Sequence, residues 1–251
     1  MNGMLAIIGG SGLDQFTGLS AATRRVVRTP YGEPSSAITT GTLGGREVMF
    51  LARHGYGHTI PPHRINYRAN LWALHELGAR EVVAVATVGG IGASFVPGSL
   101  AVPDQIVDYS HGREATFFDG SARGVTHIDF TQPYGEELRE RILRAAALAQ
   151  VAVHDGGVYG CTQGPRLETA AEINRLARDG CDMVGMTGMP EAALARELGM
   201  QYAAIAVVVN HAAGRGESAG RIDLARAEVL SRQLMQQVIS IINHLAAGNG
   251  D

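Results

Sequence analysis

Short apolar runs alternate along the chain with amphipathic segments. Runs rich in aliphatic and β-branched residues predict strands at residues 4–8, 47–51, 82–87, 100–102, 183–185 and 202–209. Apolar residues at helical spacing predict helices at residues 69–77, 136–149, 169–179, 191–198 and 223–245. Glycines at positions 78, 180 and 199 stand where three of these helices end. The alternation predicts an α/β fold with a largely parallel, helix-flanked sheet.

The domain organisation follows from length and from the absence of linkers. A chain of 251 residues is long enough for one large α/β domain. No Pro/Ser-rich linker, charge block or repeat interrupts the pattern. The segment 109–134 has few helix formers, so we expect it to be a long functional loop. We therefore expect a single domain over residues 1–251.

Composition and charge exclude several classes of protein. The 33 glycines lack a collagen period, and 45% apolar with 18% charged residues is typical of globular proteins. All 21 basic residues are arginine, which excludes lysine Schiff bases and P-loop lysines. A net charge of −3 without basic runs argues against a nucleic-acid partner. No apolar run approaches the roughly 20 residues of a membrane helix.

The cysteines and the N-terminal segment indicate the compartment. Cys161 and Cys181 have no CxxC partner, and the first residues lack the pattern of an export signal. We expect a reduced, cytoplasmic protein.

A glycine-rich turn follows the first predicted strand. The glycines of Gly9-Gly10-Ser11-Gly12 let the backbone approach an anion, and Ser11 offers a hydroxyl and an N–H, so the turn suits phosphate. It is neither a GxGxxG nor a Walker motif. Taken alone, a plain tight turn explains it at least as well.

The segment 53–70 is crowded with arginine and histidine. The guanidinium fork of Arg53 matches oxyanions. His54, His58 and His63 invite a metal, but the glycines and prolines between them prevent the helix that would align them, so we expect no metal site. A solvated loop remains the alternative.

Further candidate groups follow the other strands. Residues 86–88 are small enough for a ligand to lie against the main chain, although a packing turn explains them too. Glu168, at a predicted helix start, either compensates the helix dipole or binds a ligand. Met186 suits a flat apolar ligand, Thr187 follows it, and Asn210 either binds or serves a turn. Together they predict a cleft that holds an oxyanion beside a heterocycle.

Six segments in this order and spacing resemble the trimeric purine nucleoside phosphorylase and methylthioadenosine phosphorylase family. They are residues 9–13, 53–58, 62–70, 164–169, 185–191 and 210, and the resemblance spans residues 4 to about 245. It implies one phosphorylase domain with a mixed, mostly parallel sheet. It also implies a homotrimeric pentosyltransferase that cleaves purine nucleosides to base and pentose 1-phosphate in purine salvage. Inorganic phosphate is the co-substrate, and no cofactor is implied.

The resemblance also assigns site residues. Those that hold phosphate are Ser11, Arg53, His54, Ala86 and Thr87. Those around the nucleoside are Val88, Leu167, Glu168, Met186, Thr187, Asn210 and Ala212, joined by His127 from a neighbouring subunit. Cleavage puts negative charge on the departing purine, so Asn210 would donate to N7 while Arg53 and His54 hold the attacking phosphate.

The residues expected to bind the purine base match those of relatives that cleave 6-oxopurine nucleosides. Asn210 replaces an aspartate of the adenine-preferring relatives, and Ala212 replaces a second one. The Glu168 carboxylate can accept the N1–H that hypoxanthine has and adenine lacks. Leu167 stands where the oxopurine enzymes have a phenylalanine.

The residues expected around the ribose 5′ position favour an apolar 5′ substituent. Residues 221–232 lack the histidine that binds the ribose 5′-hydroxyl in oxopurine enzymes, and they offer Ile222, Leu224, Val229 and Leu230. The expected substrate is therefore S-methyl-5′-thioinosine. An inosine/guanosine phosphorylase, a methylthioadenosine phosphorylase and a nucleoside-binding module without turnover are the alternatives.

Overall fold

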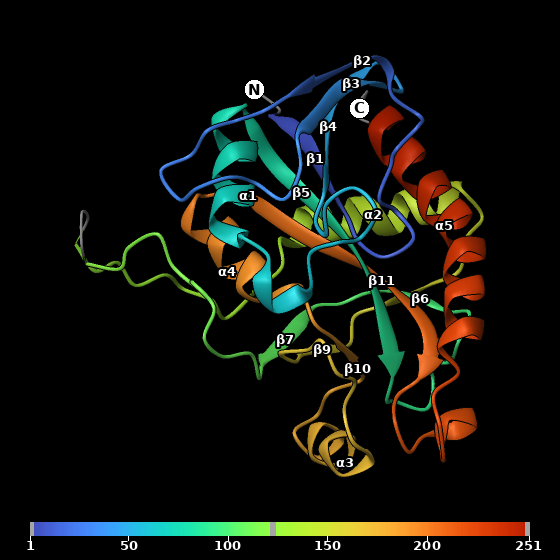
Figure 1. The fold of residues 1–251 in the computed structure, drawn as a ribbon. Helices are drawn as coiled ribbons and strands as arrows, with labels where there is room; N and C mark the ends of the chain where they lie inside the picture. The colour runs from blue at the N-terminus through green and yellow to red at the C-terminus, as the bar shows by residue number, and fades with distance from the viewer. Residues whose placement is uncertain (1–2, 121–123, 249–251) are drawn as a thin grey trace.

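The fold is built around one mixed sheet. The structure is a computed structural model that describes residues 3–120 and 124–248, and within these ranges eleven strands join in one sheet (Figure 1). The strands are β1 (Met4–Gly9), β2 (Ser20–Arg25), β3 (Ile38–Leu43), β4 (Arg46–Ala52), β5 (Ala79–Gly90), β6 (Leu100–Val102), β7 (Gln105–Asp108), β8 (Val153–Asp155), β9 (Val158–Cys161), β10 (Met183–Gly185) and β11 (Gln201–His211). The helices are α1 (Tyr67–Glu76), α2 (Glu136–Leu148), α3 (Ala170–Arg178), α4 (Gly188–Glu197) and α5 (Leu224–Ala247).

All five predicted helices and all six predicted strands are present, and the α/β class is confirmed. The sequence pattern missed β2, β3, β7, β8 and β9. Strand β2 is exposed at every position and lies at the edge of the sheet, so it carries no alternation of buried and exposed residues. β8 has only three residues, two of them polar, so it lacks the apolar run that predicts the equally short β6.

Alternate strand residues feed two separate cores. Leu5 and Ile7 of β1 pack in the cluster that contains α2 and α5, whereas Ala6 and Ile8 pack in the cluster that contains α1 and α4. Figure 1 shows these two helix pairs on opposite sides of the central strands. Because both faces are covered, the central strands are continuously apolar, which is the pattern that predicted them.

One edge of β5 is interrupted, and the interruption positions the site. Strand β11 pairs with β5 in parallel from Glu81 to Gly90. On the other edge, β1 pairs with β5 only as far as Ala84, and β10 joins it at Gly89. Among the described strands, none pairs with residues 85–88 on this edge. The candidate residues at 86–88 therefore face a gap in the sheet.

Between β7 and α2, the described residues 109–120 and 124–134 contain no helix or strand, as the sequence predicts for a long loop. Part of it extends away from the sheet and helices, at the left of Figure 1. Its near part is held by Glu197 of α4, which accepts from the Thr116 hydroxyl at 2.6 Å and from the Phe117 N–H at 2.7 Å. Among the described residues, no helix combines the length and apolar character needed to cross a membrane.

Candidate active site

A cavity of about 820 Å³ opens at the interruption in the β5 edge. It is lined by residues that follow β1, β4, β10 and β11 and by the start of α5. The structure brings twelve of the thirteen predicted site residues into its lining: Ser11, Arg53, His54, Ala86, Thr87, Val88, Leu167, Glu168, Met186, Thr187, Asn210 and Ala212. The thirteenth, His127, is exposed in the loop 109–134 and does not line the cavity of its own chain.

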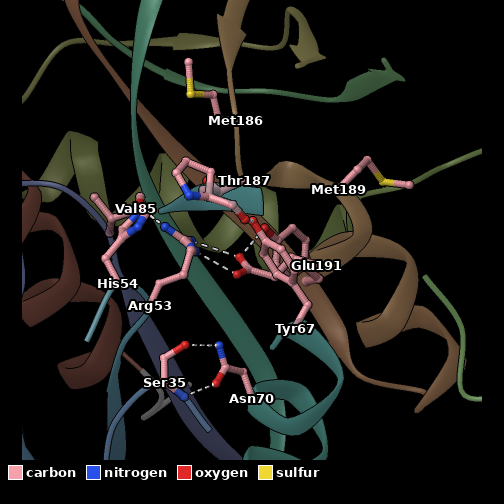
Figure 2. A network of polar contacts seen from close by, with 12 residues as sticks. Ser35, Arg53, His54, Tyr67, Asn70, Val85, Met186, Thr187, Met189 and Glu191 are labelled. Atoms are coloured by element: carbon pink, nitrogen blue, oxygen red, sulfur yellow. Dashed lines mark hydrogen bonds and ion pairs between the residues drawn. The ribbon is translucent and has the colours of Figure 1, made fainter. Parts of the chain in front are cut away.

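A buried ion pair forms the floor of the site (Figure 2). Arg53 donates from Nε and Nη2 to the Glu191 carboxylate at 2.7 and 2.9 Å, and from Nη1 to the Val85 carbonyl at 3.0 Å. The Tyr202 hydroxyl donates to the same carboxylate at 2.9 Å. The Arg53 side chain is 1% exposed and that of Glu191 is 0% exposed. Burial alone lowers the pKa of Arg53, but the Glu191 charge outweighs it and raises that pKa above its ordinary value.

The sequence predicts that the guanidinium fork of Arg53 binds an oxyanion, but in the structure the fork binds the Glu191 carboxylate. One edge of the guanidinium grips Glu191, so a bidentate grip on phosphate through that edge does not occur. Three of the five N–H donors have protein partners among the described residues, and two remain for a ligand. Glu191 lies in the segment 185–191 that carried the resemblance, yet a Glu in a helix pattern gives no signal that it pairs with Arg53.

The glycine-rich turn lies directly against this arginine. A Cβ at Gly10 would come within 2.5 Å of the Val85 carbonyl and 2.9 Å of Arg53 Nη1, so only glycine fits between β5 and the guanidinium. The Arg53 N–H donates to the Gly9 carbonyl at 3.0 Å, which ties the turn to β4. Ser11 is held at the cavity by this packing.

His54 is a neutral imidazole in a defined tautomer. Its Nδ1 lies 2.8 Å from the Ile60 carbonyl, which only accepts, so Nδ1 carries the hydrogen. Burial, and then the charge of Arg53, lower the pKa of His54 to about 4. Its Nε2 is therefore an acceptor at neutral pH, suited to a protonated phosphate oxygen. The His58 ring stacks on it at 4.3 Å, and among the described residues no three His, Cys, Asp or Glu side chains form a metal cluster.

The second half of the segment 53–70 serves structure. Asn66 caps α1 by accepting from the Ala69 N–H. Asn70 donates to the Ser35 hydroxyl at 3.0 Å and accepts from the Ser35 N–H at 2.7 Å, which fastens the chain before β3 to α1 (Figure 2). These residues explain part of the motif without contacting the cavity.

Glu168 lies one residue before the N-cap of helix α3 and takes no part in its capping box. Helix α3 begins at Ala170 with Thr169 as its N-cap, and Glu172 completes a capping box. Glu168 instead lines the cavity, and its Oε1 accepts from the Thr162 hydroxyl at 2.6 Å.

A β-bulge aims Asn210. Val208 pairs with Val88 but Asn210 pairs with Gly89, so Val209 is an extra residue in β11. Asn210 Nδ2 donates one hydrogen to the His211 carbonyl at 2.7 Å and keeps a second. The sequence contains no signal for this bulge, because β11 reads as an unbroken apolar run.

Arg113, which sequence reasoning missed, braces the strand ends that carry Met186 and Thr162. It donates to the carbonyls of Met186 at 2.9 Å, Gln163 at 2.9 Å and Thr162 at 3.2 Å. Its guanidinium also lies over the Tyr67 ring. Arg113 belongs to the loop 109–134, whose sequence offers no motif that would have singled it out.

The last part of the cavity is formed by the start of α5 and the residues just before it. Ile222 and Leu224 line it together with Ala227. Val229 and Leu230, also predicted there, are not among the described lining residues, because helical spacing turns them away. Polar groups share this end: Asp14, Ser231 and the ion pair of Glu228 with Arg232.

Comparison with known proteins identifies relatives over nearly the whole chain. Residues 4–243 match the model of the Phosphorylase superfamily. A protein of Pseudomonas syringae pv. tomato named probable S-methyl-5′-thioinosine phosphorylase is 55% identical over 233 residues, covering 93% of this chain and 94% of the relative. The 6-oxopurine nucleoside phosphorylase of Pyrococcus furiosus is 49% identical over 217 residues, covering 84% and 80%.

A solved structure of a phosphorylase also resembles this chain over nearly its whole length. The methylthioadenosine phosphorylase from Schistosoma mansoni in complex with adenine superposes with a TM-score of 0.93 at 33% identity, covering 99% of this chain and 93% of that chain. The family resemblance expected from the sequence is confirmed.

Replacing Glu191 with glutamine should destabilise the protein by about 3 to 5 kcal/mol, because Arg53 remains buried without a counter-charge. Glu140→Gln is the matched control: it breaks an exposed ion pair with Arg144, worth at most about 1 kcal/mol. Urea unfolding monitored by circular dichroism measures both. Equal small losses in the two variants would contradict a structural role for the buried pair.

The lowered pKa of His54 predicts a pH dependence of stability. As the pH falls below the ordinary value of 6.5 toward 4, the unfolded state takes up the proton before the folded state, so stability is lost over this range. His54→Asn keeps a donor for Ile60 but cannot titrate. We expect the wild type to lose about 2 to 3 kcal/mol more than this variant. Urea unfolding at pH 6.5 and at pH 4 measures this loss of stability, with the exposed His111→Asn as the control. Equal losses in the wild type and in His54→Asn would show that the pKa of His54 is not lowered by folding.

Proposed function

The chain belongs to the phosphorylase superfamily and is a nucleoside phosphorylase, a pentosyltransferase, and we propose that its substrate is S-methyl-5′-thioinosine. The products are hypoxanthine and 5-methylthioribose 1-phosphate, a step of purine salvage. One observation carries this proposal: a single cavity joins an anion-binding end, the pair Asn210 and Glu168, and the apolar start of α5.

Phosphate binds at the end of the cavity beside β5. Ser11 supplies hydroxyl and backbone donors, Thr87 lies on the open edge of β5, and Arg53 offers its two remaining N–H groups. His54 accepts a hydrogen from a protonated phosphate oxygen through Nε2. Thr187, buried after β10, lines the same cavity. The bound anion stabilises the positive charge that develops on the ribose and supplies the nucleophile.

The ribose lies over Met186, between phosphate and base. As the glycosidic bond breaks, electron density moves into the purine, and the free hydrogen of Asn210 Nδ2 stabilises it at N7. A carboxamide is enough, because a neutral donor placed at the accumulating charge lowers the barrier without transferring a proton.

Glu168 selects the base. Its carboxylate accepts from the N1–H of hypoxanthine, whereas adenine would bring an acceptor against an acceptor. The P. syringae and P. furiosus relatives, named for thioinosine and 6-oxopurine nucleosides, support a 6-oxopurine. Ala212, 1% exposed, leaves no acid to favour adenine.

The 5′ end favours a methylthio group through Ile222, Leu224 and Ala227. Inosine is the second candidate, because Asp14 and Ser231 also line this end and offer partners to a 5′-hydroxyl. The substrate comparison below separates the two.

We further propose a cytoplasmic homotrimer in which His127 reaches the cavity of a neighbouring subunit. The exposed position of His127 outside its own cavity and the extension of the loop 109–134 from the body (Figure 1) support the oligomer. The two free cysteines, both buried, suit a reducing compartment.

Phosphate-dependent turnover of S-methyl-5′-thioinosine, inosine and S-methyl-5′-thioadenosine tests the substrate directly. We expect kcat/KM for methylthioinosine to exceed that for inosine by about 10- to 200-fold, because a hydroxyl against carbon loses its hydrogen bonds. Leu224→His should narrow this gap, while Leu148→His, at an equally exposed leucine of α2, should not. Equal use of inosine would make the enzyme a plain oxopurine nucleoside phosphorylase, and base release without phosphate dependence would overturn the phosphorylase mechanism.

Replacing Asn210 with an acidic residue should change which purine base the enzyme prefers. Asn210→Asp, alone or with Ala212→Asp, provides a carboxyl that can protonate N7, and we expect preference to move toward methylthioadenosine by on the order of 1 to 3 kcal/mol. Asn174→Asp, on the exposed surface of α3, is the matched control. An unchanged ratio of the two substrates in both site variants would show that Asn210 does not read the base.

A further inference from the structure

Thr162 stands immediately after β9 and beside the cavity, and its backbone is held on both sides. Its N–H donates to the Gly185 carbonyl at 2.8 Å, which continues the pairing of β9 with β10. Its own carbonyl accepts from Arg113 Nη2 at 3.2 Å. The position of the Thr162 Cβ is therefore fixed by two neighbouring segments.

The Thr162 hydroxyl has a short contact with Glu168. Oγ1 lies 2.6 Å from Glu168 Oε1, whereas the Gly185 carbonyl is 3.4 Å away. The hydroxyl has one hydrogen, and a carboxylate only accepts, so the hydrogen points to Glu168. Threonine is branched at Cβ and stiff about χ1, so this donor keeps its direction. A charge-assisted bond of this length is among the stronger hydrogen bonds of proteins.

The second carboxylate oxygen of Glu168, Oε2, is the one available to a ligand. With Oε1 engaged by Thr162, rotation of the Glu168 carboxylate is restricted, and Oε2 is left as an acceptor. Among the described residues, Glu168 precedes the N-cap of α3 and takes no part in the capping box, so the Thr162 bond is what orients it. A fixed acceptor discriminates between bases better than a mobile one, because a mismatched base cannot turn it away.

We propose that Thr162 is a positioning residue for base recognition, whose hydroxyl holds Glu168 in the orientation that selects purines with a hydrogen on N1. The proposal rests on the proposed function, in which Glu168 reads the base. Thr162 touches neither phosphate nor sugar in this account, so its effect is confined to the choice of base.

The test compares kcat/KM for methylthioinosine and methylthioadenosine in wild type, Thr162→Val and Thr162→Ser. Valine keeps the shape and removes the hydroxyl, and serine restores it. We expect Thr162→Val to lower the methylthioinosine to methylthioadenosine ratio by about tenfold, with the phosphate KM unchanged. Thr162→Ser should stay within about threefold of the wild type. Thr17→Val, at an exposed threonine, is the control.

The possible results distinguish a failure of the proposed function from a failure of the proposed role of Thr162. A wild-type enzyme that prefers methylthioadenosine overturns the proposed function. A wild type that prefers methylthioinosine, with the same ratio in Thr162→Val, overturns the role of Thr162. Equal losses on both substrates with a raised phosphate KM also overturn it, since that pattern marks a general structural defect. Should Thr162→Val not fold, Thr162→Ala removes the same hydroxyl without the branched methyl groups, and the same ratio decides.

Discussion

The buried pair of Arg53 and Glu191 is the interaction on which the site depends. It lies where β1 has left the edge of β5 and β10 has not yet joined it, and it binds the Val85 carbonyl that this interruption exposes. The pair supplies a donor to one carbonyl of this open edge, that of Val85. With it, β4, β5 and α4 are joined at the floor of the site, against which Gly10 brings the glycine-rich turn.

The cavity separates two tasks that the reaction needs. At one end Arg53 keeps two N–H donors and the neutral His54 keeps one acceptor, an arrangement that in the proposed mechanism binds a protonated phosphate. In the proposed mechanism, Asn210 at the other end donates to the departing base and Glu168 accepts from it, so the arrangement of hydrogens on the purine decides which base is used. Both ends are built on strand termini, where the backbone is held by the sheet.

The central elements and most of the candidate residues could be predicted from the sequence, because they depend on local patterns. Apolar runs predicted the buried strands, polar residues at strand ends predicted a cleft there, and the family resemblance supplied the individual site residues. The rest depends on tertiary structure. That Glu191 pairs with Arg53, across 138 positions, and that Val209 bulges to aim Asn210 have no signal in neighbouring residues. The exposed edge strand β2 was missed because it buries neither face.

The most direct test of this account replaces the buried charges and the hydroxyl bound to them by apolar residues: Arg53→Met, Glu191→Leu and Tyr202→Phe together. Such replacements are often neutral or stabilising, so this variant should fold with a free energy of unfolding within about 2 kcal/mol of the wild type. We expect the folded variant to lose phosphate-dependent cleavage of methylthioinosine by about a thousandfold, since the two N–H donors that Arg53 keeps for the anion are gone. A folded variant that cleaves methylthioinosine with the wild-type phosphate KM would contradict the dependence of the site on the buried pair of Arg53 and Glu191.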